Sequence, residues 1–161
     1  MKIKSILILS FLILSCQNQA EEARKPKVKT IEPAPFKPIN DEIISKAVLY
    51  EANIRQYSNE GSFNAFAEDL PVLKKMGVKI IWLMPINPIS KTKSKGPLGS
   101  YYAVSDYTKV NPEFGTLDDF KSLVNKAHQL GMYVILDWVP GHTGWDHIWI
   151  KEHSDYYLKN R

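Results

Sequence analysis

The sequence GTLDDFKSLVNKAHQLGMYVILDWVPGHT, residues 115–143, contains the clearest secondary-structure pattern in this chain. Thr116 is placed as a helix N-cap, and Asp119 stands at the capping-box position, although Asp is shorter than the usual Glu and predicts a weak box. Gly131 is placed to end this helix as a C′ glycine. The apolar residues between them recur at helical spacing and predict one buried face. They are Leu117, Phe120, Leu123, Val124, Ala127 and Leu130.

An unbroken apolar run, Met132–Leu136, follows the predicted helix. Such runs are typical of parallel strands that are covered on both faces. The run ends in Asp137, and His142 follows in the next turn. Because α/β barrels place their chemistry at the carboxyl ends of strands, both residues are candidates for a functional site. The alternative is that Asp137 caps the turn and His142 lies on the surface.

The same alternation of elements extends toward the N-terminus. Residues 47–54, AVLYEANI, predict a first strand, and residues 78–84, VKIIWLM, predict a second. With the run that ends at Leu136, the order is strand, helix, strand, helix, strand. This order predicts right-handed crossovers and a parallel sheet.

Between the first two strands the sequence predicts two short helices. Ser62 is placed to cap a helix that carries Phe63, Phe66 and Leu70. Because an interior proline breaks a helical hydrogen-bond ladder, Pro71 is expected to open a second helix. That helix is expected to turn two apolar side chains inward and to stop at a glycine. These residues are Leu73, Met76 and Gly77.

Residues 85–115 form a long connection with little apolar periodicity. Connections of this length are usually functional or disordered. This one leaves the carboxyl end of the second predicted strand, so it lies over the same face as Asp137. It contains Tyr101, Tyr102 and Tyr107, and a tyrosine offers sugars both a flat apolar ring and a hydroxyl. For Tyr101 and Tyr107, packing of the loop is an equally good interpretation.

Met1–Ser15 has the pattern of an export signal, with Lys2 and Lys4 before an apolar stretch too short to span a bilayer. Cys16, the only cysteine, stands at the cleavage position after this stretch. The sequence ILSC resembles the lipobox of bacterial lipoproteins, in which the cysteine is lipidated. The alternative is an ordinary secretory signal with an incidental cysteine.

The resemblance to lipoproteins implies an exported protein with a lipid anchor at Cys16. Gln17 follows the cysteine, which in Gram-negative lipoproteins usually implies the outer membrane or cell surface. Residues 16–45 are polar, charged and rich in proline, and we expect them to form an extended tether.

The composition is that of one domain with a hydrophobic core. Of the 161 residues, 44% are hydrophobic, and the formal net charge is +4. Two of the basic residues, Lys2 and Lys4, lie in the segment that we expect to be removed. So small a basic excess does not indicate a nucleic-acid partner.

Three motifs, at residues 77–86, at 102–107 with 110–116, and at 137–143, together resemble the α-amylase family, glycoside hydrolase family thirteen. Residues 77–86, GVKIIWLMPI, are similar to the second strand of its catalytic barrel. Residues 102–107, YAVSDY, and 110–116, VNPEFGT, are similar to the loop before its second helix. Residues 137–143, DWVPGHT, are similar to its first conserved region, Asp-x-x-x-Asn-His. The motifs occur in the order and at the spacing of the family.

The resemblance implies a fold of the α/β class in which residues 46–161 form the N-terminal portion of a (β/α)8 TIM barrel, with about three strands and two helical segments. It also implies an α-glucan or maltooligosaccharide as substrate. Tyr102 would stack on the sugar at the cleavage subsite, and Asp137 would support the charged residues around it. His142 would hydrogen-bond the 6-hydroxyl of that sugar.

The chain departs from the family pattern at Gly141, where most members have Asn. That Asn commonly ligates a structural calcium through its side-chain oxygen, which Gly lacks, so the resemblance argues against calcium here and we expect no metal or cofactor. Three other histidines are interpreted as surface or loop residues and not as ligands. They are His128, His147 and His153.

We expect no catalytic residue in this chain. Retaining glycosidases need two carboxylates about 5–5.5 Å apart, which this family takes from later strands. A complete barrel typically has about 250 residues. We therefore expect a truncated, inactive part of a surface-anchored retaining α-glycosidase. The alternatives are a non-catalytic surface lipoprotein that binds glucan and the non-functional product of a broken reading frame.

Overall fold

The structure is a computed structural model, and it describes residues 37–159. The predicted signal Met1–Ser15, the predicted lipidation site Cys16 and most of the predicted tether lie outside the described residues. The end of that tether is not extended, because it forms helix α2 (Asp41–Lys46), whose N-cap Asn40 accepts a hydrogen bond from the Ile43 amide. Within residues 37–159, no helix is long and apolar enough to cross a lipid bilayer.

Three parallel strands form one sheet in the order β1–β2–β3, as the alternation predicted. They are β1 (Val48–Ala52), β2 (Val78–Leu83) and β3 (Tyr133–Leu136). Strand β2 pairs with both neighbours, and Leu83 lies opposite Ala52 on one side and Leu136 on the other. The carboxyl ends of all three strands therefore meet at the same edge of the sheet.

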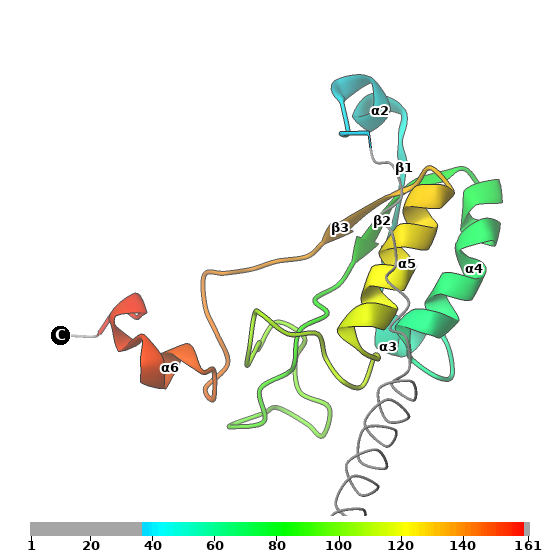
Figure 1. Ribbon diagram of the computed structural model, residues 1–161. Helices are drawn as coiled ribbons and strands as arrows, with labels where there is room; N and C mark the ends of the chain where they lie inside the picture. Colours follow the sequence, from blue (N-terminus) through cyan, green and yellow to red (C-terminus); the bar gives the residue numbers. More distant parts are fainter. Residues whose placement is uncertain (1–36, 160–161) are drawn as a thin grey trace, which may run out of the picture. The chain divides into compact units, whose positions relative to one another are not determined.

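Two helices cover one face of the sheet, α4 (Phe63–Lys75) and α5 (Leu117–Gln129) (Figure 1). Apolar residues of both helices and of the strands are buried between the two layers and form the core. Phe63 joins the helices at their N-terminal ends, with its ring 5.4 Å from that of Phe120. It also packs edge-on against Phe114, in the loop that precedes α5. Among residues 37–159, α4 and α5 are the helices that pack against the sheet, and both lie on the same face.

Pro71 does not divide α4, so the prediction of two short helices was wrong. Leu70 and Leu73, on either side of the proline, are both buried in the core. Burial of one continuous apolar face therefore outweighs the hydrogen bond that the proline cannot make. Met76 was predicted to point inward but is 68% exposed, because it caps the helix. Gly77 follows with φ +91° and ends the helix as predicted.

The first strand is shorter than predicted. Asn53 and Ile54 leave the sheet, and a short helix that was not predicted follows, α3 (Ile54–Tyr57). Ile54 is nevertheless buried. An apolar residue at the end of an apolar run joins the core from a strand or from a helical turn, and periodicity alone does not distinguish the two.

Helix α5 begins and ends where the sequence predicted. The capping box is complete and not weak: the Thr116 hydroxyl accepts from the Asp119 amide at 3.1 Å, and the Asp119 carboxylate accepts from the Thr116 amide at 2.8 Å. Gly131 has φ +69° and follows the last turn. Leu117 lies in the first turn and is exposed, so its predicted place in the apolar face was wrong.

Strand β3 is not covered on both faces as predicted. Its first residue, Tyr133, is buried, but Ile135 and Leu136 are 42% and 46% exposed. The reason is that β3 lies at an edge of the sheet, where no further strand pairs with it among residues 37–159.

Candidate functional site

Two of the three predicted substrate-binding residues meet at the carboxyl end of the sheet. The Tyr102 hydroxyl donates a hydrogen bond to Asp137 Oδ2 at 2.8 Å. Asp137 directly follows β3, and its amide donates to the Leu83 carbonyl at 2.8 Å. This bond extends the hydrogen bonding between β2 and β3 by one residue. A small pocket beside the pair is also lined by Pro85 and Asn87 at the start of the loop after β2.

The contact with Asp137 changes the acidity of the tyrosine. The hydrogen bond to Asp137 raises the pKa of Tyr102 above its usual value, and burial and the negative charges of Asp137 and Glu51 act in the same direction. Tyr102 therefore stays a neutral hydroxyl through the physiological pH range. Its ring is half-buried.

The loop between β2 and α5 is ordered by a short antiparallel contact, which explains how Tyr102 reaches this edge. Ile89 and Val104 form an isolated bridge. The Ser90 amide donates to the Ala103 carbonyl at 2.7 Å, and the Ser105 amide donates to the Pro88 carbonyl at 2.9 Å. The loop thus folds back on itself and presents Tyr102 toward the end of β3.

His142, the third predicted site residue, is held only through its backbone. The Tyr107 hydroxyl lies 2.8 Å from both the Val139 and the His142 carbonyl oxygens. The His142 side chain is exposed and forms no hydrogen bond with any residue in the described part of the chain. The structure therefore brings Tyr102 and Asp137 together, and it shows no contact between either of them and the His142 imidazole.

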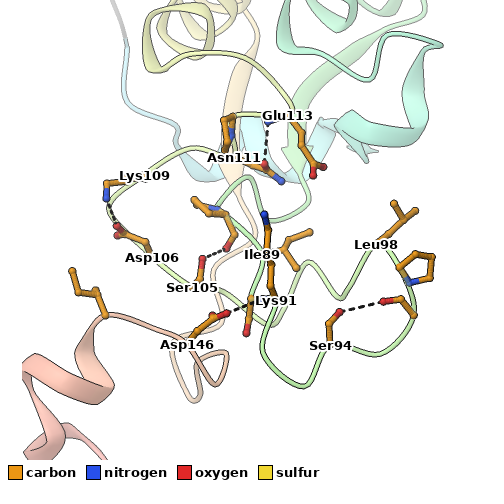
Figure 2. Close-up of a pocket in the computed structure, with 16 residues that line it drawn as sticks. Ile89, Lys91, Ser94, Leu98, Ser105, Asp106, Lys109, Asn111, Glu113 and Asp146 are labelled. Atoms are coloured by element: carbon orange, nitrogen blue, oxygen red, sulfur yellow. Dashed lines mark hydrogen bonds and ion pairs between the residues drawn. The ribbon is translucent and has the colours of Figure 1, made fainter.

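The segment after β3 is fastened to the long loop at a second point, which the sequence analysis missed. Asp146 Oδ2 accepts hydrogen bonds from the amides of Lys91 and Thr92 at 2.8 and 2.9 Å. Burial alone would raise the pKa of Asp146, but the hydrogen bonds outweigh it and lower the pKa. Asp146 and Lys91 also line a groove of about 910 Å³ (Figure 2). The three predicted site residues do not line this groove.

His147 was interpreted as a surface or loop residue, but it is 1% exposed. Its Nδ1 accepts a hydrogen bond from the Trp149 amide at 3.1 Å, and its Nε2 has no partner among the described residues. Burial lowers the pKa of His147, although the charges of Asp106 and Asp146 oppose that change. The rings of Tyr107 and Trp149 pack against His147. The aromatic residues near it in the sequence are the signal that could have indicated its burial.

The expectation that Gly141 brings no side-chain ligand to a calcium ion concerns an open position of the turn after β3. Gly141 is exposed, and no atom lies within 4 Å of the position that a Cβ would occupy. Within residues 37–159, no group of three or more His, Cys, Asp or Glu side chains is placed to hold a metal ion. That Gly141 excludes calcium stays a prediction.

Parallel strands joined by helices, with polar side chains gathered at the carboxyl ends of the strands, define this chain as part of an α/β-barrel domain. The family model for the catalytic domain of alpha-amylase matches residues 30–161. The chain therefore belongs to the α-amylase family. The match begins within the segment that was predicted to be a tether.

Individual relatives agree with this assignment. The chain is 38% identical over 113 residues to the alpha-amylase SusG of Bacteroides thetaiotaomicron, a match covering 70% of this chain and 15% of that protein. It is 32% identical over 142 residues to an alpha-glucosidase of Apis mellifera, covering 80% and 24%. The crystal structure of an alpha-amylase from Lactobacillus plantarum superimposes with a TM-score of 0.69 at 45% identity, covering 71% of this chain and 27% of that one. The chain thus spans less than a third of the length of these relatives.

Proposed function

We propose that the protein to which these residues belong is an α-glucan-active glycoside hydrolase that cleaves α-glucosidic bonds with retention of configuration. The observation that carries the proposal is the contact of Tyr102 with Asp137 at the carboxyl end of β3, in a chain of the α-amylase family. The tyrosine ring supplies an apolar face for a sugar. Asp137 orients the ring through the hydroxyl, and His142 on the neighbouring turn supplies a polar group for the 6-hydroxyl.

The catalytic carboxylates belong, in this proposal, to strands that the 161 residues do not include. Retaining cleavage needs a nucleophile and an acid/base about 5–5.5 Å apart. The proposal is supported by the small share of each relative that this chain spans. The chain alone is therefore expected to be inactive and to contribute one wall of the sugar site.

The test compares the 161-residue chain with the polypeptide from the longest continuous reading frame that contains it. We expect the longer polypeptide to release reducing sugar from starch, maltodextrin or nitrophenyl α-glucoside, and the shorter chain to release none above a buffer blank. In the longer polypeptide, Tyr102→Ala should lower kcat/KM at least about a hundredfold, because a stacking platform and the orientation of the sugar are lost together. Robust release by the purified 161-residue chain contradicts the proposal.

A reading frame that ends at Arg161, combined with retention of the chain on starch without cleavage, would support instead a non-catalytic glucan-binding lipoprotein. A chain that neither cleaves nor binds glucan would support the product of a broken reading frame.

We also propose that the protein is exported and held at a bacterial outer membrane or cell surface by lipid on Cys16, after removal of Met1–Ser15. The position of the single cysteine directly after the apolar stretch supports this. A clickable palmitate analogue fed to the expressing bacterium should label the parent chain, and Cys16→Ser should lose the label and leave the membrane fraction. Equal labelling of both chains contradicts the proposal.

A further inference from the structure

The turn that carries His142 is hydrogen-bonded to the described part of the chain through one side chain. Residues 138–142 connect β3 to the segment that contains Asp146. All hydrogen bonds that this turn makes with residues 37–159 come from the hydroxyl of Tyr107, which lies 2.8 Å from the carbonyl oxygens of both Val139 and His142. The Tyr107 ring also packs edge-on against Trp138, at 6.2 Å between ring centroids.

Tyr107 is itself firmly held. Its ring lies 5.3 Å from that of His147 and 5.7 Å from that of Trp149, and its carbonyl accepts from Asn87 Nδ2 at 3.2 Å. Burial raises the pKa of Tyr107, so the hydroxyl keeps its proton in the physiological range. That one proton serves one carbonyl at a time. The hydroxyl therefore lies between the two ends of the turn and holds them together.

No other hydrogen bond with residues 37–159 fixes the shape of the turn. Gly141 has no side chain and no neighbour that a Cβ would touch, so this position can adopt many backbone conformations. The His142 imidazole is exposed and has no hydrogen bond with the described residues. Where the imidazole points is consequently set by the backbone of the turn, and the backbone is held by Tyr107.

We propose that Tyr107 is a positioning residue that holds the turn after β3 so that His142 faces the sugar. The inference rests on the proposed function, which gives His142 its sugar contact. The geometry also favours one of the two interpretations of Tyr107 from sequence. Its hydroxyl is hydrogen-bonded to backbone carbonyls and its ring is packed against other aromatic rings, which supports a packing role.

The first experiment measures how readily a protease cleaves the turn, in the absence of any ligand. Tyr107→Phe keeps the ring and removes the hydroxyl. Tyr57→Phe is the matched control, because it removes a tyrosine hydrogen bond of 3.0 Å to Asp69 at a distant place. Chymotrypsin cleavage after the exposed Trp138, followed by mass spectrometry on the full chain, should become about fivefold faster in Tyr107→Phe and stay unchanged in Tyr57→Phe, as expected for the loss of one hydrogen bond.

The second experiment measures whether Tyr107 acts through His142. The affinity for maltoheptaose is measured by affinity electrophoresis in the longer polypeptide defined above, for the parent, Tyr107→Phe, His142→Ala and the double variant. We expect each single change to weaken binding about fivefold. The double variant should bind no more weakly than His142→Ala alone, because residues that act through one contact are not additive. A merely structural role of the hydroxyl would give additive losses.

The two experiments separate the inference from the function on which it rests. Unchanged cleavage after Trp138 in Tyr107→Phe overturns the positioning role, whatever the chain binds. Additive losses in the double variant overturn it as well. If the longer polypeptide does not bind maltoheptaose although cleavage after Trp138 accelerates, the proposed function fails and the role of Tyr107 toward a sugar fails with it.

Discussion

At the scale of single residues, the hydroxyl of Tyr102 is controlled by one carboxylate. Asp137 is both the acceptor of its hydrogen bond and the main cause of its raised pKa. Replacing Asp137 with Asn keeps an oxygen acceptor and removes the negative charge. The pKa of Tyr102 should then fall toward its ordinary value of about 10. The measurement is an alkaline titration of tyrosinate absorbance in the parent chain and in Asp137→Asn, each with and without Tyr102→Phe. The absorbance that Tyr102→Phe removes belongs to Tyr102 alone among the eight tyrosines.

The same shift has a consequence for stability. A group whose pKa is raised in the folded state contributes stability that is complete below its unfolded pKa, here about 10, and lost as the pH rises through the folded pKa. The parent chain should therefore lose more stability than Asp137→Asn in this alkaline range. Identical titrations of Tyr102 in the two backgrounds would contradict a controlling role of Asp137.

Gly144 is a second residue on which the site depends. A Cβ on Gly144 would lie 2.2 Å from the Cβ of Ser90 and 3.1 Å from the Ala103 carbonyl oxygen, whereas a Cβ on Gly141 would meet nothing within 4 Å. Gly144→Ala should force the segment after β3 away from the long loop, at a cost typical of overpacking, about 1–3 kcal/mol. Chymotrypsin cleavage after Tyr101 should then become at least about fivefold faster.

The matched control for this prediction is Gly141→Ala, which adds the same methyl group three residues earlier. Cleavage after Tyr101 should stay within about twofold of the parent, since surface substitutions usually change stability little. Equal acceleration by both substitutions would show that close contact with Ser90 is not what requires glycine at position 144.

At the scale of elements, Pro71 makes α4 less stable than its sequence would otherwise allow. The proline cannot donate the hydrogen bond of its turn, and an interior proline costs about 3 kcal/mol relative to alanine. Proline restricts the unfolded chain as well, which offsets part of that cost. Pro71→Ala should therefore raise the urea concentration that halves the helical circular dichroism. Val72→Ala, at an exposed neighbour, should change it little. A lower midpoint for Pro71→Ala would mean that the proline is required where it stands.

The elements that the sequence predicted well are those with complete local signals. Helix α5 has its cap at Thr116 and its stop at Gly131, and both lie where local chemistry placed them. Errors arose where tertiary packing decides. The core holds α4 together across Pro71, and Ile54 enters the core from a short helix and not from the strand.

For the site, the sequence placed Asp137 and Tyr102 at one edge because the connection after β2 and the end of β3 must meet there. It did not show that Tyr107 and Asp146 fasten the two segments, because these contacts join residues that are 32 to 55 positions apart. The local periodicity of apolar residues does not predict hydrogen bonds between residues so far apart in the sequence. The resemblance to a family named the residues that are predicted to bind sugar, and it did not name the ones that hold their segments together.

At the scale of the whole molecule, the described sheet has two outer edges without a strand partner, one on β1 and one on β3. Exposed apolar side chains stand on both edge strands, among them Leu49 and Ile135. An unpaired edge with apolar side chains is a template for pairing with another chain, and only closure of a barrel removes such edges. The 161-residue chain should therefore self-associate, and sedimentation velocity should show a weight-average mass that rises with concentration.

Charges on edge strands oppose pairing with another chain. The double variant Leu49→Lys and Ile135→Lys should therefore sediment with a lower mass than the parent at the same concentration. Val72→Lys places the same charge on the exposed face of α4, away from both edges, and should leave the association unchanged. If the parent chain remains a monomer at all concentrations and melts in one sharp cooperative transition, the open edges do not drive association. The 116 residues that were predicted to be part of a barrel would then form an autonomous domain.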